Sequence, residues 1–229
     1  MLKRTLIALA SALVLLPLNS LAKPFTLSHA PHPAIKSIYI PILKEVYSEL
    51  GINVEFLEMS THRGLVEANA GHVEGDVARF SEALQDYPNL MTVPTALDRA
   101  DIILLCVRET DCSDNALKDP KNRILIPTET AVVRRFIVTY PANFTPVSHS
   151  LSKSQEMLSM GRFKYALYVS TELYPHQAKT DKYNLNWAIV ESFPIFHVLH
   201  KDHEALADVI APILSRVLER YRLEQQPKQ

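Results

Sequence analysis

The chain is 229 residues long, carries a formal net charge of −1 and is 47% hydrophobic, so it can bury a full core as one large domain or as two small lobes. No basic stripe runs along it to follow phosphates, which argues against a nucleic-acid partner. It holds only 5 glycines and neither glycine-rich nucleotide-binding fingerprint, which argues against a dinucleotide site or a P-loop.

The N-terminal segment predicts export. Lys3 and Arg4 precede an apolar run from Leu6 to Leu16, and the segment ending at Ala22 places small residues where a signal peptidase cleaves. The apolar run is too short to cross a bilayer core of ~30 Å without interruption. We therefore expect a signal peptide over residues 1–22, cleavage after Ala22, and a mature chain in the periplasm.

The first half of the mature chain predicts the order strand, helix, strand, helix, strand. Apolar residues at helical spacing from Ile35 to Leu50 predict a helix that begins or kinks near Pro41 and stops at Gly51. This order makes a small, at least partly parallel sheet with helices packed on it. The expected strands are 24–30, 52–57 and 73–79, and the second helix is 64–70.

The second half repeats this order after a connecting segment with short strands at 90–93 and 102–107. Its expected elements are a strand at 123–127, a helix at 131–137, a strand at 144–147, a helix at 153–160 and a strand at 165–170. A last helix is predicted by an apolar face that recurs every three or four residues from Leu206 to Tyr221.

The two cysteines, Cys106 and Cys112, lie close together in the sequence. An oxidising compartment favours a disulfide between such a pair, and no Cys-x2-Cys motif or nearby histidine supports a redox or metal pair. We expect a structural disulfide that closes a short loop and contributes ~2 kcal/mol to stability.

One short phrase occurs in both halves of the chain. An amphipathic stretch ends at a glycine, Gly71 or Gly161, then polar residues follow and an apolar strand begins. A glycine just past a helix can take the left-handed conformation that ends it. Two such units predict two α/β lobes with a cleft between them where a ligand could sit.

This organisation resembles the bacterial extracellular solute-binding proteins of the amino-acid-binding class, which are type II periplasmic binding protein-like. The most specific phrase, ANAGHVEGDVAR, is similar to one in a divergent branch of that family, with Asn69, Gly71, Gly75 and Arg79 at the matching positions. The stretches MLSMGRFKYALYVS and FPIFHVLHKDHEALADVIAPIL are similar to later family segments. The resemblance implies a two-lobe α/β fold, with lobe one at 23–95 plus 190–229 and lobe two at 96–189.

Arg79 is the first candidate for ligand binding. It ends a predicted strand, and open α/β sheets bind ligands at the carboxyl ends of their strands. Its guanidinium could hold a carboxylate through two parallel hydrogen bonds, as an exposed cleft arginine whose removal hardly changes the unliganded protein. The alternatives are an internal pair of Arg79 with Asp76 or Glu82, and a ligand contact from Arg99 instead.

Other candidates lie near the predicted strand ends. Thr128, Glu129 and Thr130 form a strand-to-helix turn, which either binds an anion through free backbone N–H groups or simply caps the helix. The sequence also offers polar and aromatic side chains to a ligand, and these are His29, His62, Arg63 and Tyr168. The histidines lack the spacing of a metal site, and no nucleophile motif indicates an enzyme.

These observations favour a periplasmic solute-binding protein that captures a small polar or anionic ligand by hinge closure and serves an importer of the ABC type. Its partners would be the small-molecule ligand and an inner-membrane permease or a sensor protein. The alternative is an exported sensory or signalling module of the same fold that acts through a partner receptor. We expect a monomer that needs no cofactor.

Overall fold

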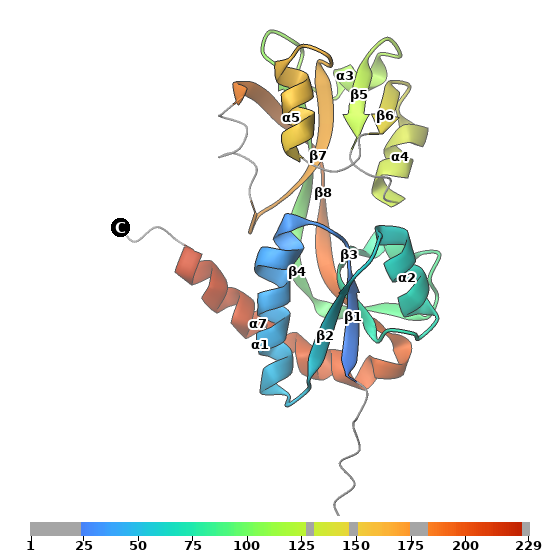
Figure 1. Cartoon of the computed structure of the whole chain (residues 1–229), viewed down its shortest axis with the longest axis vertical. Coiled ribbons are helices and arrows are strands. Elements are labelled where there is room, and N and C mark those ends of the chain that lie inside the picture. The colour runs from blue at the N-terminus through green and yellow to red at the C-terminus, as the bar shows by residue number, and fades with distance from the viewer. Residues whose placement is uncertain (1–23, 127–130, 147–150, 175–182, 226–229) are drawn as a thin grey trace, which may run out of the picture.

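The computed structural model describes residues 24–126, 131–146, 151–174 and 183–225. The predicted signal peptide lies outside these residues, and among them no helix is long and apolar enough to cross a membrane. Figure 1 shows two α/β lobes stacked along the long axis of the molecule and two long strands that run through both. All eight strands belong to one sheet, in the order β2-β1-β3-β8-β4-β7-β5-β6.

Lobe one follows the predicted order. Its elements in chain order are β1 (Phe25–His29), η1 (Ile35–Tyr39), α1 (Ile40–Glu49), β2 (Val54–Glu58), α2 (Thr61–Asn69), β3 (Gly75–Phe80) and η2 (Ser81–Leu84). β1 pairs in parallel with β2 on one side and with β3 on the other. The π-helical turn η1 changes to the α-helix α1 just before Pro41, whose ring and missing N–H disfavour a place inside a regular helix.

Lobe two repeats that order, as the sequence predicted. Its elements in chain order are α3 (Asn115–Lys118), β5 (Arg123–Ile126), α4 (Ala131–Thr139), β6 (Asn143–Pro146), α5 (Leu151–Ser159) and β7 (Tyr165–Thr171). β5 pairs in parallel with both β6 and β7. Gly71 and Gly161, which follow α2 and α5, have φ angles of 72° and 69°, so both helices end in the left-handed conformation expected of the repeated phrase.

Two long antiparallel strands, β4 (Leu90–Val107) and β8 (Leu185–His200), join the lobes. β8 pairs with β3 in lobe one, and β4 pairs with β7 in lobe two. The prediction of two separate strands at 90–93 and 102–107 is wrong, because irregular register between Thr92 and Asp98 lets one strand continue past Pro94. After β8 the chain forms the short turn η4 (Lys201–His203) and the helix α7 (Glu204–Gln225).

The predicted disulfide is confirmed. Cys106, near the end of β4, is bonded to Cys112 in the following loop, with their Cα atoms 5.7 Å apart. Cys106 is fully buried and packs in the lobe-two core with Ala116 and Leu117 of α3. The bond thus holds the loop after β4 against lobe two.

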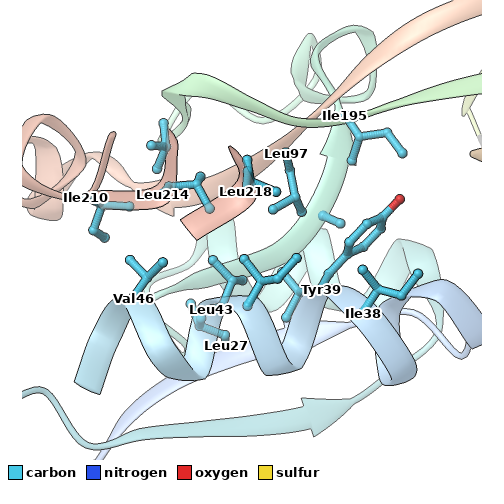
Figure 2. Packing of buried hydrophobic residues seen from close by; sticks show 14 of the residues in the cluster. Leu27, Ile38, Tyr39, Leu43, Val46, Leu97, Ile195, Ile210, Leu214 and Leu218 are labelled. Carbon is cyan, nitrogen blue, oxygen red and sulfur yellow. The ribbon is translucent and has the colours of Figure 1, made fainter. Parts of the chain in front are cut away.

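The largest core cluster joins α7 to α1 across lobe one. Figure 2 shows Ile210, Leu214 and Leu218 of α7 facing Leu43 and Val46 of α1. Each of these five side chains is at most 1% exposed. The final helix therefore packs on α1 of lobe one through its apolar face.

Leu214→Ala should lower the free energy of unfolding by ~2–5 kcal/mol, because it opens a cavity in this cluster. Leu223→Ala is the matched control, since Leu223 lies on the same helix but is 60% exposed. The control should stay within ~0.5 kcal/mol of the wild type in urea denaturation. Equal effects of the two substitutions would mean that α7 is not docked on α1.

A buried histidine connects β8 to two other elements of lobe one. His197 is fully buried, with Nδ1 2.9 Å from the carbonyl oxygen of Asp76 and Nε2 2.8 Å from the hydroxyl oxygen of Tyr47. The carbonyl oxygen can only accept, so Nδ1 donates and Nε2 accepts from the tyrosine, which suits a neutral ring. Burial lowers the pKa of His197 from 6.5 to about 4.

Because the pKa of His197 is lower in the folded than in the unfolded state, its contribution to stability is complete above ~pH 6.5 and is lost as the pH falls toward 4. We expect the free energy of unfolding of His197→Gln to fall less steeply than that of the wild type between these pH values. Parallel pH profiles for His197→Gln and the wild type would contradict the assignment.

Candidate functional site

A cavity of about 440 Å³ lies between the lobes, on the side where α4 of lobe two approaches lobe one at α2 (Figure 1). Lobe one contributes most of its wall, from the segment around η1, from α2, from β3 and from the segment that begins with η2. Arg135 of α4 and Val169 of β7 contribute from lobe two, and Ile195 contributes from β8. The volume is in the usual range for a small-molecule site.

Arg79 lines this cavity but is not an exposed arginine. Its side chain is 6% exposed, and Nη2 donates to Oδ2 of the fully buried Asp76 at 2.7 Å. In a regular strand two residues three positions apart face opposite sides. The register between β3 and β8 shifts between Asp76 and Arg79, and such a bulge lets both side chains reach the same side.

Three donors hold the Asp76 carboxylate. Oδ2 accepts from the Ser28 hydroxyl at 2.7 Å as well as from Arg79, and Oδ1 accepts from the Ala78 amide at 3.1 Å. Burial raises the pKa of Asp76, and the Arg79 charge and these hydrogen bonds oppose that shift. The result is a hydrogen-bonded ion pair beneath the cavity.

Helix α2 lies directly on this ion pair, and Gly64 makes the close approach possible. A Cβ at Gly64 would lie 3.1 Å from Arg79 Nη2, 3.1 Å from Ser28 Oγ and 3.2 Å from Asp76 Oδ2. Glycine inside a helix costs ~1 kcal/mol relative to alanine, so this position trades helix propensity for contact with the pair. The Ser28 hydroxyl also lies 3.3 Å from the Gly64 carbonyl oxygen, which ties helix to strand.

One nitrogen of the Arg79 guanidinium has no partner among the described residues. Nη1 lies 3.2 Å from the carbonyl oxygen of Ala78, and Nη2 is also 3.5 Å from that of Thr61. Nε is buried and has no hydrogen-bond partner among the described residues. A buried N–H without an acceptor costs free energy, and here it belongs to a side chain in the cavity wall.

Other polar side chains of the wall are held by neighbours. The hydroxyl of Tyr39 donates to Oδ2 of the buried Asp98 on β4 at 2.7 Å, and the backbone amide of Leu173 donates to the same oxygen at 3.3 Å. Leu173 follows β7, so one carboxylate oxygen of β4 connects lobe one to lobe two. On α2, Nδ1 of His62 lies 3.1 Å from the hydroxyl oxygen of Tyr87.

Arg135 is the charged residue that lobe two contributes to the described wall. It pairs with Glu191 of β8 at 2.5 Å and lies over the ring of Phe193, 4.9 Å from its centroid. Phe193 packs edge-on against Phe80 of β3, with the ring centroids 5.7 Å apart. These contacts connect α4 to β8, and β8 to the end of β3.

The sequence-predicted candidates are only partly brought together. Arg79 and His62 both line the cavity. Arg63, next to His62, points away and pairs with Glu67 at 3.5 Å. The candidate turn Thr128, Glu129 and Thr130 lies outside the described residues.

The remaining candidates lie apart from the cavity wall. His29 is 4% exposed and borders a shallow groove elsewhere on lobe one, with Nδ1 3.1 Å from the carbonyl oxygen of Ala30. Tyr168 packs in the lobe-two core, where burial raises its pKa to about 12, and it contacts the ring of His32, a residue of the wall. Arg99 is exposed and pairs with Glu172 at 3.0 Å.

Several wall residues had no signal in the sequence analysis: His32, Tyr39, Asp86, Tyr87 and Arg135. They come from three separate segments, and only the folded chain brings them together. Two patterns could have pointed to part of the site. These are the two charged residues Asp76 and Arg79 within an otherwise apolar strand, and a glycine inside the helix before it. Among the described residues, no group of three or more His, Cys, Asp or Glu side chains could hold a metal ion.

No protein-family model matches the sequence, and no curated protein matches it. Solved structures do match. The GluR0 ligand-binding core from Nostoc punctiforme with L-glutamate has a TM-score of 0.68 and 11% identity, over 86% of this chain and 94% of that chain. The substrate-binding protein AbpA of an amino acid ABC transporter from Streptococcus pneumoniae, bound to L-arginine, has a TM-score of 0.65 and 14% identity, over 88% and 92%.

A third match is a putative L-cystine ABC transporter protein from Listeria monocytogenes, with a TM-score of 0.64 and 14% identity, over 86% of this chain and 91% of that chain. At this level of identity the likeness concerns the fold. The chain has the two-lobe, type II periplasmic binding protein-like fold, and the predicted fold class is confirmed.

The burial of Arg79 corrects the expectation that its removal hardly affects the unliganded protein. Arg79→Ala leaves the Asp76 carboxylate buried without its partner, so the free energy of unfolding should fall by ~3–5 kcal/mol. The control is Arg63→Ala. Arg63 is exposed on helix α2 of the same lobe and pairs with Glu67, four positions later. Its removal should cost ~0.5 kcal/mol or less. Chemical denaturation without ligand measures both, and equal losses would contradict the buried pair.

Proposed function

We propose that this chain is a solute-binding protein that captures a small polar molecule in the cavity between its lobes. One observation carries the proposal: the unused Nε–H of Arg79, buried in the wall of a cavity that both lobes enclose. An acceptor atom of a ligand would complete the hydrogen bonding of this guanidinium. Such a donor is held ready by the fold, because Asp76, Ala78 and Thr61 already engage the other nitrogens.

The proposed mechanism is hinge closure. Among the described elements, only β4 and β8 run through both lobes, so rotation about these strands would open the cavity to solvent (Figure 1). We place lobe one at 23–95 with 190–229 and lobe two at 96–189. A ligand that contacts walls from both lobes would favour the closed state over the open one.

The compartment and the partners are part of the proposal. The N-terminal sequence supports export to the periplasm, and the disulfide between Cys106 and Cys112 suits an oxidising compartment. Two of the structural neighbours are described as proteins of ABC transporters, which supports delivery of the ligand to an inner-membrane permease. The role is binding rather than catalysis, in line with the absence of a nucleophile motif from the sequence.

Arg79→Lys separates the binding role of Arg79 from its structural role. Lysine keeps a positive charge beside Asp76, but it lacks the Nε donor and the planar fork. We expect the mature protein to bind a compound from a thermal-shift screen of amino acids, amines and carboxylates, and Arg79→Lys to weaken that binding ~10-fold or more, measured by calorimetry. Small-angle scattering should show a smaller radius of gyration with the compound bound.

Arg99→Lys is the matched control, since Arg99 was the other arginine candidate and does not line the cavity. Its affinity should equal that of the wild type. Equal affinity of Arg79→Lys and the wild type, or a radius of gyration that the bound compound leaves unchanged, would contradict the proposal.

A further inference from the structure

The charges of the cavity wall indicate which ligands it can hold, given the binding function proposed above. Four charged residues of the described chain line it: Arg79, Glu82, Asp86 and Arg135. The net charge that a ligand meets depends on which of these four residues already form salt bridges.

Both arginines are already neutralised. Arg79 forms its ion pair with the fully buried Asp76 at 2.7 Å, so it offers a directed N–H but little net positive charge. Arg135 pairs with Glu191 at 2.5 Å and lies over the ring of Phe193. An anionic ligand would have to compete with these carboxylates for both guanidinium groups.

The two acids of the wall differ from the arginines in their partners. Within the described residues neither Glu82 nor Asp86 has a salt bridge, and the one hydrogen bond to Glu82 comes from the hydroxyl of Ser81 at 3.2 Å. Glu82 lies in η2 and Asp86 two residues after its end, and η2 contacts α4 of lobe two. The described wall therefore has an excess of negative charge.

The rest of the wall suits an apolar body with a positive group. Aliphatic side chains come from Ile35, Leu65, Val169 and Ile195, and aromatic rings come from Tyr39, Phe80 and Tyr87. An ammonium group can lie against an aromatic ring as well as beside a carboxylate. The Nε–H of Arg79 has no hydrogen-bond acceptor among the described residues, and an oxygen at the other end of the ligand would provide one.

We propose that the ligand is an organic cation: an amine on an apolar body that also carries a carbonyl or hydroxyl oxygen. The oxygen accepts from Arg79 Nε, the body packs on the apolar wall, and the ammonium group lies near Glu82 and Asp86. This wall disfavours a ligand with a free carboxylate, because both arginines of the wall already form salt bridges.

The test uses four compounds that share one body and differ in charge: L-phenylalaninamide, L-phenylalanine, N-acetyl-L-phenylalanine and N-acetyl-L-phenylalaninamide. The same four derivatives of leucine provide a smaller body. Calorimetry near pH 6.5, below the ~7.7–8.0 at which free amino groups titrate, keeps the amide amines charged. We expect the cationic amide to bind ~10-fold or more tightly than the other three members of at least one series.

Glu82→Gln with Asp86→Asn should remove most of this preference for the cation, ~10-fold in its affinity. The control is Glu55→Gln with Asp208→Asn, which removes the same charge from exposed positions of lobe one away from the cavity wall. It should keep the preference of the wild type.

The cation proposal is overturned if the zwitterion, the anion or the neutral compound binds as tightly as the cationic amide, or if neither amide binds at ~10 mM. It is also overturned if the acidic double variant and its control bind the cationic amide alike. Tight binding of an anion with closure of the lobes would leave the proposed binding function intact. A bound compound that does not close the lobes would remove the binding function itself.

Discussion

The buried ion pair between Asp76 and Arg79 connects the fold of lobe one to the chemistry of the cavity. An unpaired carboxylate in this place would be strongly destabilising, so the pair constrains everything packed against it. The bulge in β3 brings the two side chains to one side, and Gly64 lets α2 lie on top of them. The same contacts that satisfy Asp76 hold the guanidinium in the cavity wall and leave its buried Nε without a partner among the described residues.

The second constraint is the pairing of β4 with β8, which makes one sheet out of two lobes. Around this pairing lie contacts that join the lobes, above all the carboxylate of Asp98, which accepts from Tyr39 of lobe one and from the backbone of Leu173 beyond β7. Tyr39 also lines the cavity, so a ligand that touches its ring lies next to the hinge. In the hinge closure that we propose, the position of a ligand and the angle between the lobes are therefore connected.

Much of the fold could be predicted from the sequence, because its signals are local. The periodic apolar residues of α1 and α7 and the glycines after α2 and α5 depend on neighbours a few positions away. β8 escaped the sequence analysis as a strand, since its partner β4 lies about 90 residues earlier and its exposed half, with Trp187 and Ile189, shows little alternation of apolar and polar residues.

The site was predicted less well, because its geometry depends on contacts between residues that are far apart in the sequence. Arg79 could be found from its place at a strand end, but its burial depends on a bulge set by pairing with β8. Arg135 reaches the wall from the other lobe, and its partner Glu191 is on a third element. His29 ends β1 but borders a separate groove, and Tyr168 lies in the middle of β7, where it packs in the lobe-two core.

We propose that a ligand atom accepts a hydrogen bond from the Nε–H of Arg79, which has no partner among the described residues. Proton–nitrogen NMR of arginine side chains observes this group directly, and the loss of one signal in Arg79→Lys assigns it. With the tightest-binding compound of the screen at saturation, we expect the Arg79 Nε–H signal to shift and its exchange with water to slow, while the signal of Arg63 stays in place. An Arg79 signal that saturation leaves unchanged in position and exchange rate would contradict the account.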